Sequence, residues 1–260
     1  VLSRRQRQMC IRDSCFYFQK TRICFSRYVE FIERVILEIL ILAVVTLPLL
    51  TALFLKVASR FLNELLTNFI TINAALLSVA VSFFMFGYLL LDKFKPIKFE
   101  LFEWYPSPQI IFEFYLDGLS GVMMILISGL SLVIQLFSTS YMSKDEKYTK
   151  YFEYFNFFVF SMLLLVLSGN FLVMFFGWEL VGLSSYLLIS FWYEKNSAAK
   201  AGNKAFILNR IGDFGFIIGL MMILNYFKTF NFVDIFDSVL IKQPPNLDPV
   251  SYTHLTLPTT

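Results

Sequence analysis

The sequence predicts an all-α fold, a polytopic bundle of about six transmembrane helices, and three observations support this prediction. Of the 260 residues, 57% are hydrophobic and only 16% are charged, and the mean hydropathy is +0.66. A soluble domain has about a quarter of its residues charged. Apolar runs long enough to cross a bilayer recur along the chain, separated by polar or proline-containing segments. This combination is typical of a multi-pass membrane protein.

Both ends of the chain carry residues that we expect to be foreign to the protein. Residues 9–14 and 250–255 back-translate into nucleotide sequences that are reverse complements of each other and resemble the mosaic-end adapter of transposase-based sequencing libraries. We therefore expect residues 1–14 and 250–260 to be translated adapter, and we leave them out of the fold.

The cysteines and the histidine do not predict a metal site. The expected adapter segments contain the only histidine, His254, and one of the three cysteines, Cys10. Cys15 and Cys24 are too far apart for a CxxC motif and have no partner at metal-ligating spacing.

The positions of the membrane spans follow from the thickness of the bilayer, whose core of about 30 Å needs roughly 20 apolar residues per helix. A polar segment at 15–34 precedes the spans, and an exposed, proline-containing tail at 228–249 follows them. The polar stretch 92–115 contains three prolines and is predicted to be an extramembrane loop. Lysine and arginine are divided evenly between the segments on the two sides of the membrane, so they do not predict the orientation of the chain in the membrane. The bundle is expected over 35–227, with spans near 35–57, 69–91, 116–141, 153–167, 171–192 and 205–227.

The fourth and fifth spans are predicted from one continuous apolar stretch, 155–192. As a single helix it would be roughly 57 Å long, which is too long for one crossing. Ser168, Gly169 and Asn170 are the expected break, because glycine accepts turn conformations and the two polar side chains can satisfy freed backbone groups.

The sixth span places two charged side chains inside the membrane. The uncharged run 214–227 would make only about 21 Å of helix, so a helix that crosses must begin near Ala205. Arg210 and Asp213 would then lie on its first turns, on one helical face, where they can form an ion pair. An internal pair that only fixes helix packing is the alternative to a functional role.

Glu179 is the most deeply placed carboxylate in the predicted bundle, roughly 12 Å from one end of the fifth span and 20 Å from the other. Inserting such a group costs about 2.5–3.5 kcal/mol, so it is expected either to pair with a cation or to be protonated. Either state makes it a candidate proton carrier, and a carboxylate hydrogen-bonded for packing alone is the alternative. Gly182 and Tyr186 share roughly its stripe, where the glycine would let a neighbouring helix approach and the tyrosine would supply one hydroxyl. Two interpretations of Glu38, in the first span, stay open: a position near the membrane interface, or a functional role.

Several functional classes lack their signatures. The sequence has no GxGxxG motif, no P-loop and no nucleophile elbow. Basic residues are spread among the loops and do not gather with aromatic residues, so nucleic-acid binding is not predicted.

Two motifs resemble a known family. Residues 176–189, FGWELVGLSSYLLI, and 203–215, NKAFILNRIGDFG, are similar to the fifth and sixth helices of the antiporter-like chain 5 subunits of NADH-quinone oxidoreductase, respiratory complex I. Shorter matches at 102–104, 116–120 and 141–143 follow the same order, and the resemblance covers roughly 35–227.

The resemblance implies a membrane-arm subunit that translocates protons while the assembled complex passes electrons from NADH to quinone. Glu179 matches the family's proton-relay glutamate, whose partner lysine should lie on a later, broken helix. Arg210 and Asp213 match charged positions of the sixth helix, and Lys204 aligns as well, although at a helix end it could serve only as an interfacial anchor. Leu180 replaces the family's usual glycine, which puts close helix packing at that point in doubt.

The resemblance also implies cofactors and partners. No cofactor is expected on this chain, because NADH, flavin, iron-sulfur clusters and quinone belong to other subunits of the complex. The expected partners are the other membrane-arm subunits and the lipid bilayer. A composition typical of AT-rich codons favours the mitochondrial inner membrane, with the bacterial plasma membrane as the alternative. This stretch alone is not expected to pump.

Two other functional classes stay open. The large subunit of a multisubunit cation/proton antiporter shares these helices and the glutamate, and a purely structural membrane subunit is the third possibility. The residues at positions 206, 209 and 210 (Phe206, Asn209 and Arg210) favour the complex I subunit over the antiporter.

Overall fold

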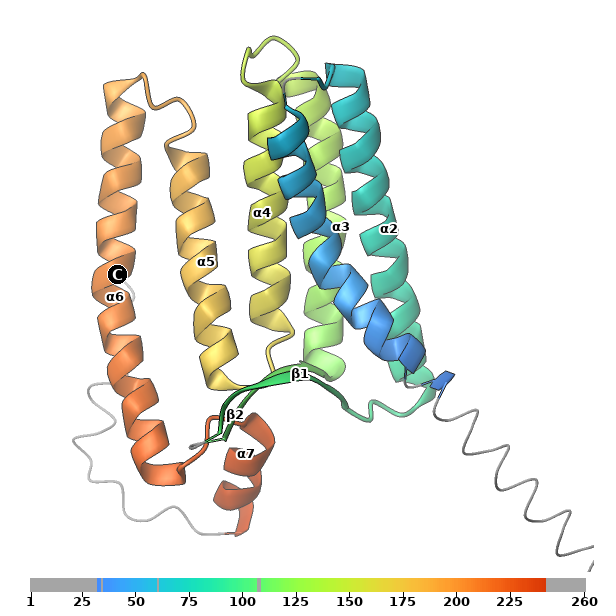
Figure 1. Ribbon diagram of the computed structural model, residues 1–260, viewed down its shortest axis with the longest axis vertical. Helices are drawn as coiled ribbons and strands as arrows, with labels where there is room; N and C mark the ends of the chain where they lie inside the picture. Colours follow the sequence, from blue (N-terminus) through green and yellow to red (C-terminus); the bar gives the residue numbers. More distant parts are fainter. Residues whose placement is uncertain (1–31, 34, 60, 107–108, 242–260) are drawn as a thin grey trace, which may run out of the picture.

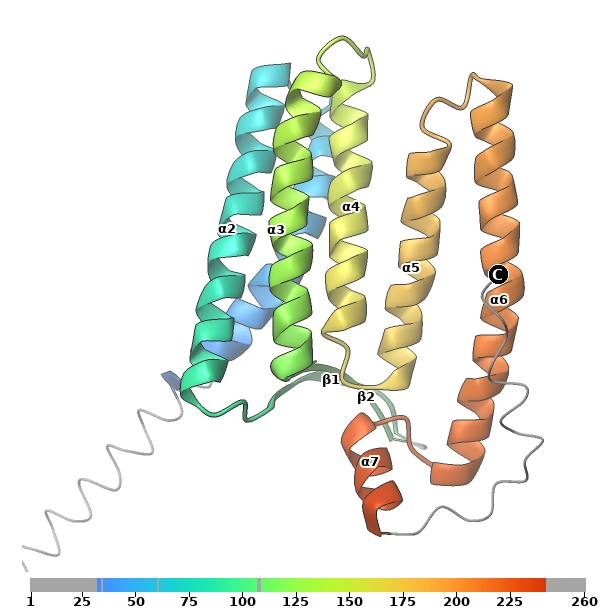
Figure 2. The same cartoon turned by 180° about the vertical axis from the view of Figure 1, so that it is seen from behind.

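The chain forms a row of long, roughly parallel helices with a small hairpin across one end (Figures 1 and 2). The computed structural model describes residues 32–33, 35–59, 61–106 and 109–241. The expected adapter segments, most of the polar N-terminal segment and all four of the cysteine and histidine positions discussed above lie outside these residues. The elements are an N-terminal span Val35–Ala58, α2 Glu64–Leu91, β1 Ile97–Pro106, β2 Gln109–Leu116, α3 Gly118–Tyr141, α4 Tyr148–Val166, α5 Phe171–Ile189, α6 Asn196–Phe227 and α7 Phe232–Ile241.

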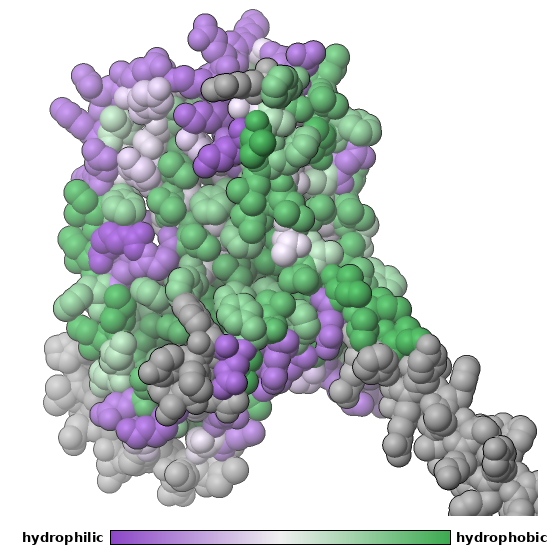
Figure 3. Space-filling model, in the orientation of Figure 1, coloured by the Kyte–Doolittle hydropathy of each residue, from purple (hydrophilic) through white to green (hydrophobic). Residues whose placement is uncertain are grey.

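The predicted fold class is confirmed. Within the described residues, five helices are long and apolar enough to cross a membrane: the N-terminal span, α2, α3, α5 and α6. The surface supports this arrangement, because on the face that Figure 3 shows, apolar side chains cover most of the middle of the bundle and hydrophilic side chains gather at both ends. The chain is therefore an integral, multi-pass membrane protein.

The predicted fourth span is the exception among the long helices. α4 runs beside α3 and α5 in both views (Figures 1 and 2), but it is absent from the five sufficiently apolar helices. Lys150, Glu153 and Asn156 all lie in its first half, and they lower its hydropathy. Asn156 is buried and accepts a hydrogen bond from the amide of Gln135 on α3, at 3.4 Å.

Helices α2 and α6 begin earlier than predicted. α2 starts at Glu64 instead of near residue 69, and α6 starts at Asn196 instead of near Ala205. A start near Ala205 corresponds to the shortest form of α6 that could cross the membrane. The polar residues before Ala205 continue the same helix beyond it, because alanine and lysine favour helix wherever water can solvate their side chains.

The core lies between the N-terminal span, α2, α3, α4 and the hairpin. Its fully buried apolar side chains include Ile41, Leu89, Met124 and Leu163. The facing stripes of α2 and α3 also bury small polar residues, and the hydroxyls of Ser82 and others bond back to a carbonyl of their own helix. Small residues let the helix backbones approach closely, as in other membrane bundles. The buried small polar residues are Thr67, Thr71, Ser78, Ser82, Ser120, Ser128, Ser131 and Ser138.

The predicted loop 92–115 contains an antiparallel hairpin of β1 and β2 that lies against one end of the bundle (Figure 1). Its register shifts twice along β1, next to Glu100 and Glu103. Phe102 stacks on Phe112 with ring centroids 5.4 Å apart. The alternation of apolar and charged residues, with one face toward the bundle, is the pattern of a half-buried strand.

The break between α4 and α5 falls at 168–170, as predicted, and the hairpin explains how its backbone is satisfied. The backbone N–H of Gly169 donates to the carbonyl of Glu113 at 2.9 Å, so the segment adds to the edge of β2. Asn170 caps α5 by accepting from the N–H of Val173 at 2.8 Å, and its amide donates to the carbonyl of Ile111 at 2.6 Å.

The prediction of an exposed tail from residue 228 is wrong for its first part. Residues 232–241 form α7, and Phe230 and Ile235 are buried. The backbone N–H of Phe171 donates to the carbonyl of Phe230 at 3.0 Å. The prolines further along indicated an irregular segment, but apolar residues before them contact the start of α5, where Phe232 packs on Phe171 with ring centroids 4.7 Å apart.

A charge cluster between α5 and α6

Glu179 lies near the middle of α5. At ~1.5 Å per residue it is roughly 12 Å from Phe171 and 15 Å from Ile189, the ends of that helix. Because α5 ends before the predicted residue 192, the carboxylate is closer to the centre of its helix than the sequence indicated. The prediction that Glu179 is deeply placed therefore agrees with the helix bounds.

Arg210 and Asp213 also lie near the middle of their helix, and not on its first turns. α6 runs from Asn196 to Phe227, so the two residues are roughly 21 and 26 Å from its first residue. The earlier start of α6 is the reason for this difference. Both charges are consequently level with Glu179 on the neighbouring helix.

The three charged side chains form one cluster. The Nη1 atom of Arg210 pairs with Oε2 of Glu179 across the two helices, and the same nitrogen lies 3.6 Å from Oδ2 of Asp213. Of the two states expected for Glu179, paired with a cation or protonated, the structure has the pair, with Arg210 as the cation. The predicted pair of Arg210 with Asp213 is also present. One guanidinium bridges two carboxylates.

Trp178 completes the cluster, although the sequence analysis did not assign it a role. Its indole Nε1–H donates to Oδ1 of Asp213 at 2.8 Å, and its ring stacks on Phe216 with centroids 6.2 Å apart. The side chain of Asp213 is 7% exposed, that of Glu179 21% and that of Arg210 39%. Asp213 is therefore held in place on two sides, whereas Arg210 reaches the surface of α6.

Small and aromatic side chains shape the contact between the two helices. Gly182 lies against the amide of Asn209, whose nitrogen would be 3.7 Å from an added Cβ. Tyr186 packs on Phe206 with ring centroids 5.4 Å apart, and the guanidinium carbon of Arg210 lies 4.8 Å from the Phe206 centroid. The expectation that a neighbouring helix approaches at Gly182 is confirmed, and Tyr186 contacts the same helix through its ring.

Lys204 and Glu38 are not part of the cluster. Lys204 is exposed on α6, roughly 9 Å before Arg210 along the helix, and within the described residues it makes no ion pair or hydrogen bond. Glu38 is half-buried near the start of the N-terminal span. That span packs with α2, α3 and α4, away from α6 (Figure 1).

Leu180 replaces a glycine that the family uses for close helix packing, but in α5 the close packing occurs one turn earlier, at Gly177. Leu180 packs against the main core, while Gly177 faces α4. An added Cβ at Gly177 would lie 2.6 Å from the Cα of Leu165, a distance that real Cβ atoms do not show. The close approach of α4 and α5 therefore occurs at Gly177, and the resemblance did not identify this position.

Two family models match the chain. Residues 104–152 match the N-terminal model of NADH-ubiquinone oxidoreductase (complex I) chain 5, and residues 168–254 match the transmembrane model of the NADH:quinone oxidoreductase/Mrp antiporter family. The two matches together include β2, α3, α5, α6 and α7.

Curated relatives agree with the family models. The chain is 37% identical over 195 residues to NADH-quinone oxidoreductase subunit L of Rickettsia bellii, covering 74% of this chain and 30% of that protein. It is also 37% identical over 194 residues to NADH-ubiquinone oxidoreductase chain 5 of Acanthamoeba castellanii, covering 74% of this chain and 28% of that protein. The chain thus spans about 30% of the length of the relatives it matches.

A solved structure shares the fold. A chain of the membrane-bound sulfane sulfur reductase, an archaeal respiratory membrane complex, superposes with a TM-score of 0.65 at 22% identity, covering 74% of this chain and 38% of that one. The family models and the relatives place the chain in the family of antiporter-like membrane subunits that includes chain 5 of NADH:quinone oxidoreductase.

Proposed function

We propose that the full-length protein is a membrane-arm subunit of respiratory complex I, in which Glu179, Arg210 and Asp213 relay protons while the complex passes electrons from NADH to quinone. The observation that carries the proposal is the bridged charge cluster in the middle of two membrane helices. Charged side chains at this depth are costly and mark ion or proton routes in membrane proteins.

The charge balance of the cluster suits a proton carrier. Two carboxylates and one guanidinium leave one excess negative charge when all three are ionised, and a single proton neutralises it. A proton on Glu179 would end its attraction for Arg210 and leave the guanidinium to Asp213. Because Trp178 and the ion pair hold Asp213, the movable group is Arg210, whose position would report the protonation of Glu179.

The remaining site residue and the partners belong to the same proposal. Lys204 would exchange protons or anchor α6 at the membrane surface, outside the cluster. NADH, flavin, iron-sulfur clusters and quinone would be handled by other subunits, and the neighbours of this chain would be the other membrane-arm subunits. The membrane would be the mitochondrial inner membrane or the bacterial plasma membrane.

Substitution of Glu179 by glutamine in the full-length protein, within the assembled complex, tests the relay. Glutamine keeps the size of the side chain and removes the titratable group. We expect the rate of proton translocation to fall at least about tenfold, the factor that about 1.4 kcal/mol of added barrier produces. The measurement is proton uptake into sealed vesicles during NADH oxidation.

The matched control is Glu146→Gln, because Glu146 is exposed in the connection between α3 and α4 and should leave translocation unchanged. If Glu179→Gln translocated protons at the wild-type rate in an assembled complex, the relay role of Glu179 would be wrong and a purely structural role would be favoured.

A cation/proton antiporter is the second candidate, because the matching family model also includes Mrp antiporters. Vesicles that hold the protein without any NADH-oxidising partner distinguish the two. An antiporter would exchange an imposed Na⁺ gradient for protons in such vesicles, whereas a complex I subunit would not.

A further inference from the structure

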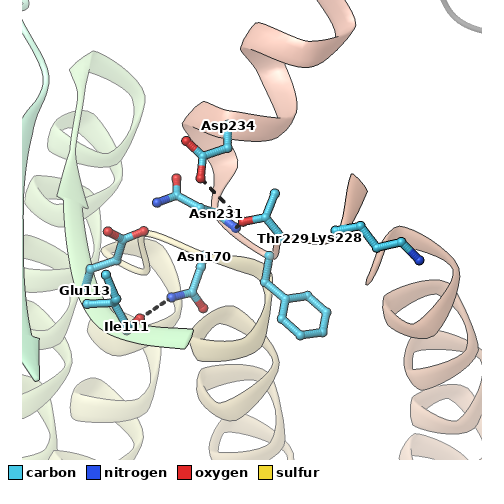
Figure 4. A pocket seen from close by; sticks show the side chains of 8 residues that line it. Ile111, Glu113, Asn170, Lys228, Thr229, Asn231 and Asp234 are labelled. Carbon is cyan, nitrogen blue, oxygen red and sulfur yellow. Dashed lines mark hydrogen bonds between the residues drawn. The ribbon is translucent and has the colours of Figure 1, made fainter. Parts of the chain in front are cut away.

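A cavity lies outside the membrane helices, where the hairpin, the break between α4 and α5 and the start of α7 meet (Figure 4). Its volume is about 270 Å³, and its polar lining includes Glu113, Asn170, Thr229, Asn231 and Asp234. These side chains come from three elements that are far apart in the sequence. The space is large enough for an ion with several waters, since a water molecule occupies about 30 Å³ in the liquid.

Glu113 is the unusual member of this lining. It is 1% exposed, and both of its carboxylate oxygens are buried without a hydrogen-bond partner. The side chain is confined by Gly169, where an added Cβ would lie 2.5 Å from Cγ of Glu113. A buried charged group without a hydrogen-bond partner costs several kcal/mol, so a cation bound at its oxygens would stabilise an ionised Glu113.

The neighbouring side chains offer oxygen atoms, and within the described residues no ammonium group forms an ion pair with Glu113. Figure 4 shows the carboxylates of Glu113 and Asp234 and the amide of Asn231 turned toward the same space. The hydroxyl of Thr229 lies 3.4 Å from Oδ2 of Asp234. Lys228 also lines the cavity, but its ammonium points away and donates to Asn225 at 3.3 Å.

We propose that this cavity is a binding site for a hard divalent cation, held by the carboxylates of Glu113 and Asp234 together with neutral oxygens of Thr229 and Asn231. Two carboxylates would neutralise one divalent ion. Within the described residues no three acidic, cysteine or histidine side chains gather as a metal site, so neutral oxygens must supply the remaining ligands. Ca²⁺ accepts such mixed oxygen ligands in flexible geometry, whereas Mg²⁺ demands a near-ideal octahedron.

The electrostatic surroundings of Glu113 are consistent with this site. Burial, with smaller contributions from Glu100 and Asp234, raises the pKa of Glu113 to about 7, and Lys98 on β1 opposes the rise. A proton therefore competes with the cation for the same carboxylate near neutral pH. Cation binding should weaken as the pH falls below about 7.

Equilibrium binding of ⁴⁵Ca²⁺ to the full-length protein in its membrane complex tests the proposal, at pH 8 and in the presence of excess Mg²⁺. We expect Glu113→Gln to weaken Ca²⁺ binding at least tenfold, with the loss of one bound ion per chain. Asp237→Asn is the matched control, because Asp237 is exposed on the same helix α7 but does not line the cavity. Asp234→Asn should also weaken binding, and its exposed side chain makes a folding defect improbable as the cause.

The thermal unfolding midpoint provides a second measurement that does not depend on activity. Ca²⁺ should raise the midpoint of the wild-type protein and of Asp237→Asn, and it should leave Glu113→Gln unchanged. Equal Ca²⁺ binding by wild type and Glu113→Gln would overturn the proposal. A wild-type protein that binds no Ca²⁺ at pH 8 would also overturn it and assign Glu113 to a proton alone. The proposal is independent of the relay in α5 and α6, since Glu179→Gln should not alter Ca²⁺ binding.

Discussion

Glu179 and Glu113 are both removed from bulk water, yet their surroundings differ. Glu179 faces another helix and is met there by Arg210. Glu113 has no partner for either oxygen. A charge inside the bilayer must be paired within the protein, whereas a carboxylate at the membrane surface can be satisfied by an ion from solution. The two residues are therefore suited to different tasks.

The raised pKa of Glu113 predicts how stability depends on pH when divalent cations are chelated. The pKa rises from 4.5 to about 7 on folding, so the folded state holds the proton more tightly than the unfolded state. This contribution is fully present below pH 4.5 and is lost as the pH rises through 7. We expect the unfolding free energy to fall by on the order of 2 kcal/mol between pH 5 and pH 8. This is less than the full effect of the pKa difference, because the range begins above the unfolded-state pKa of 4.5.

The measurement is the thermal unfolding midpoint of wild type and Glu113→Gln across this pH range, in a chelating buffer. The difference between the two proteins isolates Glu113 from the other titrating groups. The glutamine variant should be the more stable protein at pH 8. A constant difference across the range would contradict a pKa near 7.

At the scale of elements, glycine positions decide how closely the helices approach. Gly177 brings α5 onto the backbone of α4, next to Leu165. Gly182 meets only the far end of the Asn209 side chain, at an ordinary contact distance. Gly212 on α6 has open space where a side chain would begin. The same residue type therefore carries a packing constraint at one position and none at another.

Alanine substitution separates these cases. In a helix interior, glycine to alanine normally stabilises by about 1 kcal/mol. At Gly177 the new Cβ would meet backbone atoms of Leu165 that cannot rotate away, so we expect a net destabilisation of about 1–3 kcal/mol, typical of overpacking. Gly212→Ala is the matched control and should be neutral or stabilising. Thermal unfolding in detergent measures both, and equal midpoints for the two variants would contradict the close contact of α4 and α5.

The break between α4 and α5 joins the membrane helices to the structure at their end. Its three residues bond to β2 on one side and to the segment before α7 on the other. Backbone groups freed by a helix break are thus satisfied by extramembrane strands and not by lipid, as the low polarity of a bilayer requires. The same segment forms part of the wall of the proposed cation site.

For the whole molecule, burial is uneven along the row of helices. In the apolar part of each membrane helix, 39% of the residues are buried in the N-terminal span and in α3, but only 17% in α5 and 11% in α6. α6 nevertheless carries the charge cluster, and Figure 3 shows a hydrophilic patch within the apolar belt over this helix. A guanidinium facing lipid would cost about 2.5–3.5 kcal/mol. We therefore expect further protein to cover this face of α6.

Photo-cross-linking from Ile211 tests this expectation, since Ile211 is 67% exposed next to Arg210. A photoreactive residue at that position in the full-length protein should label protein, from the same polypeptide or a neighbouring subunit. A probe at the fully buried Leu163 should label the adjacent helices and reports the labelling efficiency. Adducts of the Ile211 probe with lipid alone would show that the face is exposed to the bilayer.

Much of the candidate site could be predicted from the sequence because a charge within an apolar run is conspicuous. Glu179, Arg210 and Asp213 were identified in this way, and the cost of burying Glu179 indicated that it pairs with a cation or is protonated. The partner itself could not be identified, because the pairing depends on how α5 and α6 are aligned, and α6 begins well before its apolar part. Trp178 gave no signal, since a tryptophan in a membrane helix is ordinary. Glu113 was missed because it lies in a segment that composition marked as a polar loop.

The class of the fold, the positions of most helices and the break at 168–170 follow from the sequence, because hydrophobic length and turn residues act locally. The hairpin, the packing of α7, the contact at Gly177 and the bridging of two carboxylates by one guanidinium became visible in the folded chain. Each of these depends on contacts between residues far apart in the chain. Their energy comes from complementary surfaces that form only when the helices are side by side, so a short stretch of sequence does not predict them.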